Sequence, residues 1–222
     1  MKLYRHTIAS IVTVLTTALF LNACSDPADD KEVAVVKDAL EVNTAATKDG
    51  EESIAVVAEG TVYTMDNDES SITFTGSKPT GTHSGGWSGY VGTVTVPDGD
   101  FARATIIIDF DMNSTYSDDK DLTDTLKSDK MFDVEKHPDA KFVSTSIAET
   151  SDGYDVSGNL TLHGITKNLT FSAEVELDDK KVIAESEFSI NRKDFDINYD
   201  GLVGDLIREK VVMLFYIEAN VD

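Results

Sequence analysis

The sequence predicts an all-β domain in which about eight antiparallel strands close into a barrel, accompanied by one or two short helices. Polar and apolar residues alternate over 159–163 and again over 169–176, with Gly164 between the two runs. Successive side chains of a strand face opposite sides of a sheet, so this pattern indicates a hairpin with one apolar and one polar face. Similar runs recur along much of the chain. A sheet of that many strands avoids exposed edges by closing on itself.

Residues typical of turns separate the expected strands. Gly89 and Gly92 interrupt one of the longer runs, which suggests a bulge or bend, and Pro97 begins a turn. The expected strands cover 61–65, 70–76, 87–96, 104–110, 140–149, 153–163, 169–176, 180–191 and 211–221.

The period of two is lost over 117–132. Ser117 is a suitable N-cap there, and Leu122 and Leu126 lie four residues apart, as on one face of a helix. A short helix is therefore expected. A second helical turn is expected at 202–208.

Residues 1–23 have the pattern of an export signal. Lys2 and Arg5 precede an apolar run over 8–21, which is short for a membrane-spanning helix. The four residues that end at Cys24, Leu-Asn-Ala-Cys, resemble the lipobox of bacterial lipoproteins, in which the cysteine becomes the acylated first residue. The sequence thus predicts Cys24 as a site of lipid attachment.

Cys24 is the chain's only cysteine, so no internal disulfide can form, and acylation explains a lone cysteine in an exported protein. The alternative is an ordinary secretory signal with an incidental free thiol. The expected location is the bacterial cell envelope, with the protein anchored in a membrane on the periplasmic side or at the cell surface.

Residues 24–60 are expected to form an acidic, flexible tether, because they contain no aromatic residue and little that could build a core. The folded domain is expected to cover 61–222. Without Lys2 and Arg5, 17 basic residues face 41 acidic ones, a net charge of 17 − 41 = −24. This charge argues against nucleic acid as a partner. It does not define an oligomeric state.

The residue pattern contains no set typical of catalysis or metal binding. His83, His137 and His163 are scattered, and strands would have to bring them together to form a metal site. A calcium-loop-like run at 109–120 lacks glycine at its sixth position and glutamate at its last. We therefore expect no enzyme activity, no metal and no cofactor.

Four segments in order carry a resemblance to the YceI-like family. They are KSDKMFDVEKHPDAKF at 127–142, followed by Ser144 and Thr145, GNLTLHGITK at 158–167, INRKDF at 190–195 and VGD at 203–205. The likeness extends over about 61–222. It implies an extended lipocalin-like antiparallel barrel whose interior binds a long isoprenoid or similar lipid chain, possessing no catalytic residues.

The alternating apolar positions are the candidate lining residues, although each of them could equally serve plain core packing. Burying one five-carbon unit of such a lipid is worth about 3–4 kcal/mol. The candidates are Phe74, Ile106, Ile108, Phe142, Leu160, Leu162, Phe171, Phe188 and Leu214.

The chain departs from the family pattern at two positions. Trp87 follows a glycine pair where the family commonly has phenylalanine, which could alter the shape of the cavity. Asp196 stands where the family commonly has glycine.

Two alternatives to a lipid carrier remain at this point. The barrel could be filled by its own side chains and serve as a structural or interaction module, or it could be an enzyme of lipid or quinone metabolism. The acidic composition favours a neutral ligand such as an isoprenoid quinone over a prenyl phosphate, unless Arg192, Lys193, Arg208 or Lys210 gather near the cavity mouth.

Overall fold

The structure, a computed structural model, describes residues 26–41, 59–203 and 205–221. The expected export signal and Cys24 lie outside the described residues. The strands are β1 (Val35–Asp38), β2 (Thr61–Met65), β3 (Ser71–Lys78), β4 (Gly81–Trp87), β5 (Tyr90–Val96), β6 (Thr105–Asp111), β7 (Thr115–Ser117), β8 (Asp139–Thr150), β9 (Gly153–Leu162), β10 (Ile165–Leu177), β11 (Lys181–Asn191), β12 (Gly201–Leu202), β13 (Asp205–Leu206) and β14 (Lys210–Val221). The described ranges also contain α1 (Lys120–Lys127) and the 3-10 helices η1 (Pro97–Gly99), η2 (Phe101–Arg103), η3 (Met112–Ser114) and η4 (Arg192–Phe195).

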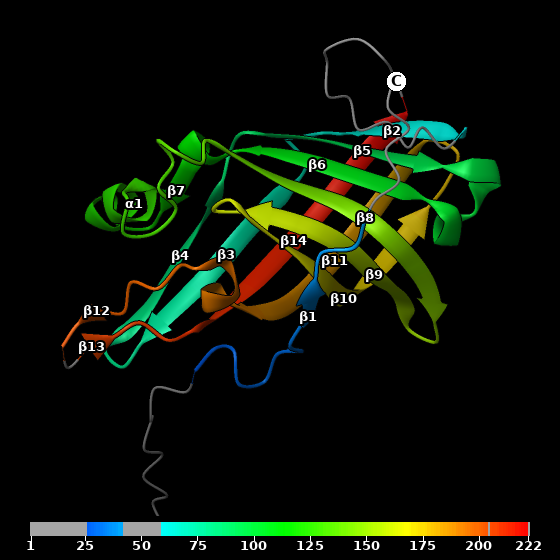
Figure 1. Ribbon diagram of the computed structural model, residues 1–222. Coiled ribbons are helices and arrows are strands. Elements are labelled where there is room, and N and C mark those ends of the chain that lie inside the picture. Colours follow the sequence, from blue (N-terminus) through cyan, green and yellow to red (C-terminus); the bar gives the residue numbers. More distant parts are fainter. Residues whose placement is uncertain (1–25, 42–58, 204, 222) are drawn as a thin grey trace, which may run out of the picture.

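Eight antiparallel strands form a closed barrel, as predicted (Figure 1). Each strand pairs with the next in the order β10, β9, β8, β6, β5, β2, β14 and β11, and β11 returns to β10. Closure encloses the apolar faces of the strands. The predicted fold class is confirmed.

One end of the barrel is extended by three further strands. Near its C-terminal end, β14 pairs with β2. Along the same edge, residues 212–216 of β14 pair with β3. From β3 the sheet continues to β4 and then to β7, next to which α1 lies. Figure 1 shows α1 and the β12–β13 hairpin at this end, and the C-terminus at the other.

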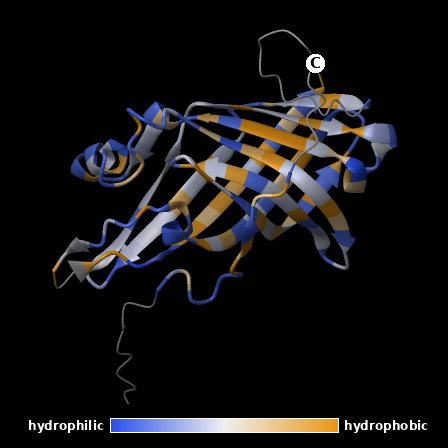
Figure 2. Cartoon of the chain, in the orientation of Figure 1, coloured by the Kyte–Doolittle hydropathy of each residue, from blue (hydrophilic) through white to orange (hydrophobic). Residues whose placement is uncertain are grey.

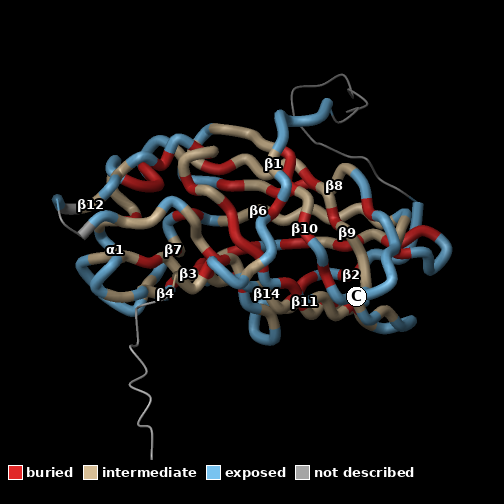
Figure 3. Tube along the Cα trace, turned by 90° about the horizontal axis from the view of Figure 1, so that it is seen from below, coloured by how far each residue is buried: buried red, intermediate tan, exposed pale blue. Residues whose placement is uncertain are grey.

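Alternation along the strands separates the interior from the surface (Figures 2 and 3). On β14, Met213, Phe215 and Ile217 pack in the core, whereas Leu214 between them is exposed. Burying a large apolar side chain contributes about 1.5–3 kcal/mol, so the shared inward face is the main source of stability.

The hairpin at the centre of the sequence pattern forms as expected. Leu162 of β9 pairs with Ile165 of β10 across His163 and Gly164, whose φ angles are 52° and 74°. Two residues with positive φ make the tight turn that matches the twist of antiparallel strands, and glycine favours such a conformation. The Nδ1 atom of His163 lies 3.0 Å from the carbonyl oxygen of Phe195, which fastens the turn to η4.

Part of the segment expected to be a flexible tether belongs to the barrel wall. In the described structure β10 and β11 pair only over residues 174–177 and 182–185, which leaves a seam between the remainder of the two strands. β1 pairs with β10 over 167–170, and Ala34 donates a backbone hydrogen bond of 2.9 Å to Ser189 of β11. Ala34 is buried in the core cluster. The sequence missed this strand because its few apolar side chains gain their packing only from the distant seam.

Three other expectations about local structure need correction. The helix starts later than expected, because Asp119 rather than Ser117 caps it: the Asp119 carboxylate accepts the Leu122 N–H at 2.8 Å. The expected helical turn at 202–208 is instead the β12–β13 hairpin. The expected long strand at 87–96 is divided at residues 88–89 into β4 and β5, which pair with different partners.

Candidate ligand-binding cavity

A partly open cavity of about 570 Å³ occupies the end of the barrel near α1 and the β12–β13 hairpin. Small-molecule sites commonly have volumes of about 300–1,000 Å³. The cavity is lined by Ile72, Phe74, Gly76, Ser77, Lys78, His83, Trp87, Phe110, Met112, Asp119, Asp121, Leu122, Thr125, Leu126, Met131, Phe132, Ala140, Leu160, Leu162, Ile190, Arg192, Phe195, Ile197, Tyr199, Gly201, Ile207, Val211 and Met213. Most of these side chains are apolar, and the charged ones belong to the rim and the helix.

Four aromatic side chains shape one wall of the cavity. The ring of Trp87 lies 5.3 Å from that of Phe74, 5.7 Å from that of Phe110 and 6.0 Å from that of Phe132, centroid to centroid. The Phe110 contact is edge-to-face, an arrangement that aromatic rings prefer, and the other two are tilted. These contacts hold a rigid apolar surface that a slender apolar chain can lie against.

A second aromatic group lies just beyond the inner end of the cavity. Three of its rings lie two residues along a strand from a cavity-lining residue, on the side away from α1. These pairs are Phe142 and Ala140 on β8, Phe188 and Ile190 on β11, and Phe215 and Met213 on β14. Phe171 and Phe188 are stacked, with centroids 4.4 Å apart and ring planes 2° from parallel. This inner aromatic group consists of Phe142, Phe171, Phe188 and Phe215. The cavity therefore lies on the α1 side of the inner group.

Eight of the nine lining residues expected from the sequence fall into three sets. Phe74, Leu160 and Leu162 line the cavity. Ile106 and Ile108 pack against the core but do not line it, and Phe142, Phe171 and Phe188 belong to the inner group.

Leu214 is a correction. It is 49% exposed on the outer surface, and its neighbour Met213 takes the inward position. Residues 211–217 are almost continuously apolar, so the sequence carries no alternation from which to choose the inward set. Pairing of Met213 with Phe74 and Phe188, both inward-facing, fixes that choice.

Arg192 organises the rim of the cavity. Its guanidinium is buried, and it donates hydrogen bonds to the carbonyls of Arg208 at 3.1 Å and Ile207 at 3.2 Å, to that of Ile197, and to the Asp200 carboxylate at 3.1 Å. A buried arginine is stable only when its charge and donors are matched in this way. It ties η4 to the segment that leads into the β12–β13 hairpin.

Comparison with known proteins identifies the family. The YceI-like domain description matches residues 63–219. The chain belongs to the YceI-like family. It is 40% identical to a UPF0312 protein of Pseudomonas putida over 96 residues, 40% of this chain and 50% of that protein. It is 32% identical to Protein YceI of Salmonella arizonae over 122 residues, 52% of this chain and 64% of that protein. The matched part thus spans less than two thirds of these relatives' length.

Solved structures share the YceI-like fold. BcnA of Burkholderia cenocepacia superposes with a TM-score of 0.61 at 22% identity, covering 70% of this chain and 99% of that one. A polyisoprenoid binding domain from Saccharophagus degradans, implicated in plant cell wall breakdown, gives 0.57 at 17% identity and covers 72% and 98%. The YCEI protein of Campylobacter jejuni gives 0.54 at 19% identity and covers 62% and 84%.

Trp87, one of this chain's departures from the YceI-like pattern, lines the cavity and is buried. Among the described residues its indole N–H has no hydrogen-bond partner. A buried donor left unpaired costs about 1–3 kcal/mol relative to one that is paired. Trp87 therefore enlarges the apolar surface of the cavity wall, but it buries an unpaired N–H group that phenylalanine would not have.

Asp196, the second departure, has a φ angle of 57° and ends η4. This left-handed conformation is the one that glycine adopts freely, and aspartate tolerates it better than most other residues. Glycine would therefore fit this turn without strain, and aspartate is accommodated there in this chain.

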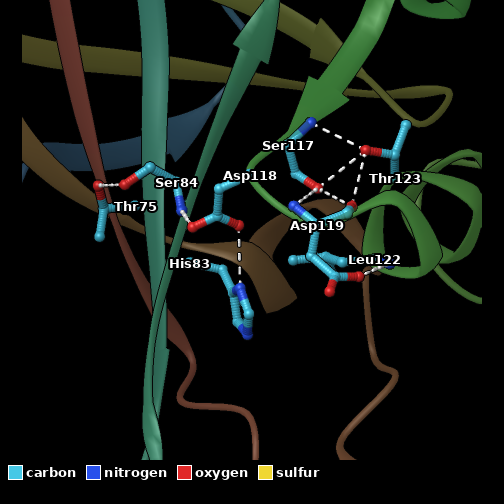
Figure 4. A network of polar contacts seen from close by, with 8 residues as sticks. All are labelled: Thr75, His83, Ser84, Ser117, Asp118, Asp119, Leu122 and Thr123. Carbon is cyan, nitrogen blue, oxygen red and sulfur yellow. Dashed lines mark hydrogen bonds and ion pairs between the residues drawn. The ribbon is translucent and has the colours of Figure 1, made fainter.

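A polar network at the rim positions α1 against the cavity (Figure 4). The Nδ1 atom of His83 lies 2.9 Å from one oxygen of Asp118, and the Ser84 N–H donates to the other at 3.1 Å. The hydrogen bond with His83 is the main reason that the pKa of Asp118 is below its usual value. The network joins β4 to the residues that lead into the helix, whose Leu122 and Leu126 line the cavity.

His83, His137 and His163 do not form one cluster. The rings of His137 and His163 are 4.9 Å apart, centroid to centroid, whereas His83 belongs to the rim network. Within residues 26–41, 59–203 and 205–221, no group of three or more histidine, cysteine, aspartate or glutamate residues is arranged to bind a metal ion. In those same ranges no helix is long and apolar enough to cross a bilayer.

Proposed function

We propose that this protein is a non-catalytic carrier for a long isoprenoid or similar lipid chain in the bacterial cell envelope. The observation that carries the proposal is the apolar cavity at one end of a closed barrel. Its walls are aliphatic and aromatic, so they favour an apolar chain of limited width and distinguish poorly between headgroups. The polyisoprenoid binding domain with the same fold supports this class of ligand.

The energy available from the cavity is sufficient for binding. Each buried methylene contributes about 0.8 kcal/mol, so a five-carbon unit contributes roughly 3–4 kcal/mol. Association costs several kcal/mol, and micromolar affinity requires about −8.2 kcal/mol in total. A few buried units reach this value, and the rest of a long chain can extend through the partly open end.

We propose a neutral headgroup, such as that of an isoprenoid quinone. Basic residues do gather at the rim, but acidic residues already pair with them. Lys193 lies 3.2 Å from Asp200 and 3.0 Å from Glu209, and Asp200 also pairs with Arg192. A phosphate would have to compete with these carboxylates.

We also propose that Cys24 is acylated and anchors the protein in a membrane of the envelope, after removal of residues 1–23 as an export signal. Multiple acyl chains give stable anchoring where one chain is marginal. Intact-mass analysis of the protein from the membrane fraction tests this. A mature chain that starts elsewhere, or an unmodified Cys24, would contradict it.

The carrier proposal is tested by extracting lipid from natively purified protein and identifying it by mass spectrometry. Two neighbours on β14 provide matched variants, because Met213 lines the cavity and Leu214 faces outward. Met213→Trp should fill part of the cavity and reduce the recovered lipid, whereas Leu214→Trp should leave it unchanged. Absence of lipid from the unsubstituted protein would favour a purely structural or interaction module, and a prenyl phosphate in place of a quinone would reverse the headgroup assignment.

A further inference from the structure

The first described residue of the chain is fixed at the rim of the cavity. One carboxylate oxygen of Asp26 accepts hydrogen bonds from the Ser77 hydroxyl at 3.1 Å and from the Ala28 N–H at 3.1 Å. The other lies 3.5 Å from the Arg208 guanidinium. Ser77 itself lines the cavity, and the Asp26 side chain is largely buried. The chain thus enters the barrel at the cavity rim and not at the far end.

Cys24 precedes Asp26 by two residues. Two extended residues span at most about 7 Å. An acyl anchor on Cys24 would therefore hold the rim next to the bilayer surface. Residues 42–58 come after Asp26 and β1 in the chain, so they cannot act as a spacer between Cys24 and this rim.

An apolar hairpin stands beside this anchoring point. Val203 is fully exposed and Leu206 is 54% exposed. Leu206 is two residues from Arg208, which contacts Asp26 and whose N–H donates to the Ser77 carbonyl at 2.9 Å. Gly201, the first residue of the hairpin, and Ile207, which directly follows it, line the cavity.

We propose that the β12–β13 hairpin docks into the interface of the lipid bilayer, so that the cavity mouth faces the membrane and lipid passes directly between the two. This rests on the proposed lipid anchor and carrier function, and adds the orientation and the docking residues. Exposed apolar side chains at a short anchor are suited to shallow insertion, about 5–10 Å into the headgroup region. The strongly acidic chain makes a zwitterionic surface the appropriate partner.

The test uses the full-length protein, purified from bacterial membranes and reconstituted into phosphatidylcholine vesicles that contain a spin-labelled lipid as quencher. Two exposed valines are replaced singly by cysteine and labelled with an environment-sensitive fluorophore: Val203→Cys on the hairpin and Val221→Cys near the opposite end of the barrel. The unsubstituted protein is the labelling blank, because acylated Cys24 has no free thiol.

We expect the emission of the label at 203 to shift to the blue and to fall by about half on quencher-containing vesicles, and the label at 221 to be unaffected. Equal behaviour of the two labels would overturn the proposed orientation. Labelling of the blank, or failure of the protein to stay on the vesicles, would overturn it as well.

A second measurement connects docking with transfer. Val203→Asp combined with Leu206→Asp should slow lipid transfer from the barrel to vesicles by about tenfold while leaving equilibrium lipid binding unchanged. The control pair, Val91→Asp with Leu214→Asp, changes exposed residues of the outer wall and should have no effect. Lipid recovered from the same preparations distinguishes failure of the orientation from failure of the carrier function. If lipid is bound but the label at 203 stays in water, only the orientation is refuted. If no lipid is bound but the label at 203 enters the bilayer, only the carrier function is refuted.

Discussion

Phe188 lies just beyond the inner end of the cavity, next to the lining residue Met213, so Phe188→Ala should lengthen the chain that the barrel accepts. The ring of Phe188 is 5% exposed and stacks on Phe171. Replacing a buried phenylalanine by alanine costs about 3–5 kcal/mol, including a penalty of about 24 cal/mol for each Å³ of void left behind. Loss of the stacked pair, worth about 0.5–1.5 kcal/mol, places the expected cost in the upper part of that range.

A longer ligand should recover part of this loss. The new space continues the existing cavity, so one further five-carbon unit can enter it and contribute about 3–4 kcal/mol. The expected result is a variant that is unstable when empty and stabilised more by a longer chain than by the one preferred by the unsubstituted protein. Competition among isoprenoid alcohols of increasing length, together with urea unfolding with and without each alcohol, measures both effects.

Phe101→Ala is the matched control. Phe101 is 3% exposed and packs edge-to-face on Tyr154 with centroids 5.0 Å apart, but it does not line the cavity. It should lose similar stability without any change in length preference. An unchanged preference in folded Phe188→Ala, or a shifted one in Phe101→Ala, would refute the role of the inner aromatic group.

Three further predictions concern the cavity wall, the seam and the rim. Trp87→Phe removes the unpaired indole N–H, so the midpoint of urea unfolding should stay equal or rise. A fall of more than about 2 kcal/mol in the free energy of unfolding would show that this N–H is paired. Ala34→Asp places a carboxylate in the core at the seam and should speed hydrogen exchange of the β10 amides over 167–170. Val35→Asp, at an exposed position, should not change this exchange. Equal exchange in the two variants would argue against β1 as part of the barrel wall. Hydrogen bonding with Lys193, and then with Arg192, lowers the pKa of Asp200 below 3.8, so its stabilising contribution is present above about pH 4 and is lost as the pH falls through the lowered value. The melting temperature of Asp200→Asn should therefore fall less between about pH 6 and pH 3 than that of the unsubstituted protein, and parallel curves would contradict this.

The fold could be predicted well because its determinants are local. The β9–β10 hairpin follows from two alternating runs around a His-Gly turn, and both the strands and the positive φ angles of the turn are present. The N-cap prediction at Ser117 was wrong, because Asp119 is also a good capping residue. The hydrogen bond from the Leu122 N–H to Asp119 decides between them.

The cavity could be predicted only in part. Leu160 and Leu162 alternate with polar residues, so their inward direction is readable from the sequence, and both line the cavity. The run around Met213 and Leu214 has no such contrast, and the wrong one of the two was expected to face inward. The role of Arg192 at the rim could not be predicted, because it depends on hydrogen bonds to backbone carbonyl groups within 197–208 that only the folded chain brings to its side chain.

By itself, the sequence determined an antiparallel barrel and the inward direction of eight of the nine lining candidates, because strand alternation is a property of adjacent residues. Only the tertiary structure decided where along the interior the cavity lies, since that depends on how rings from distant strands such as Phe171 and Phe188 meet. It also decided that residues near Ala34 complete the wall. Their hydrogen bonds and burial are supplied by strands more than a hundred residues away, and no local pattern records them.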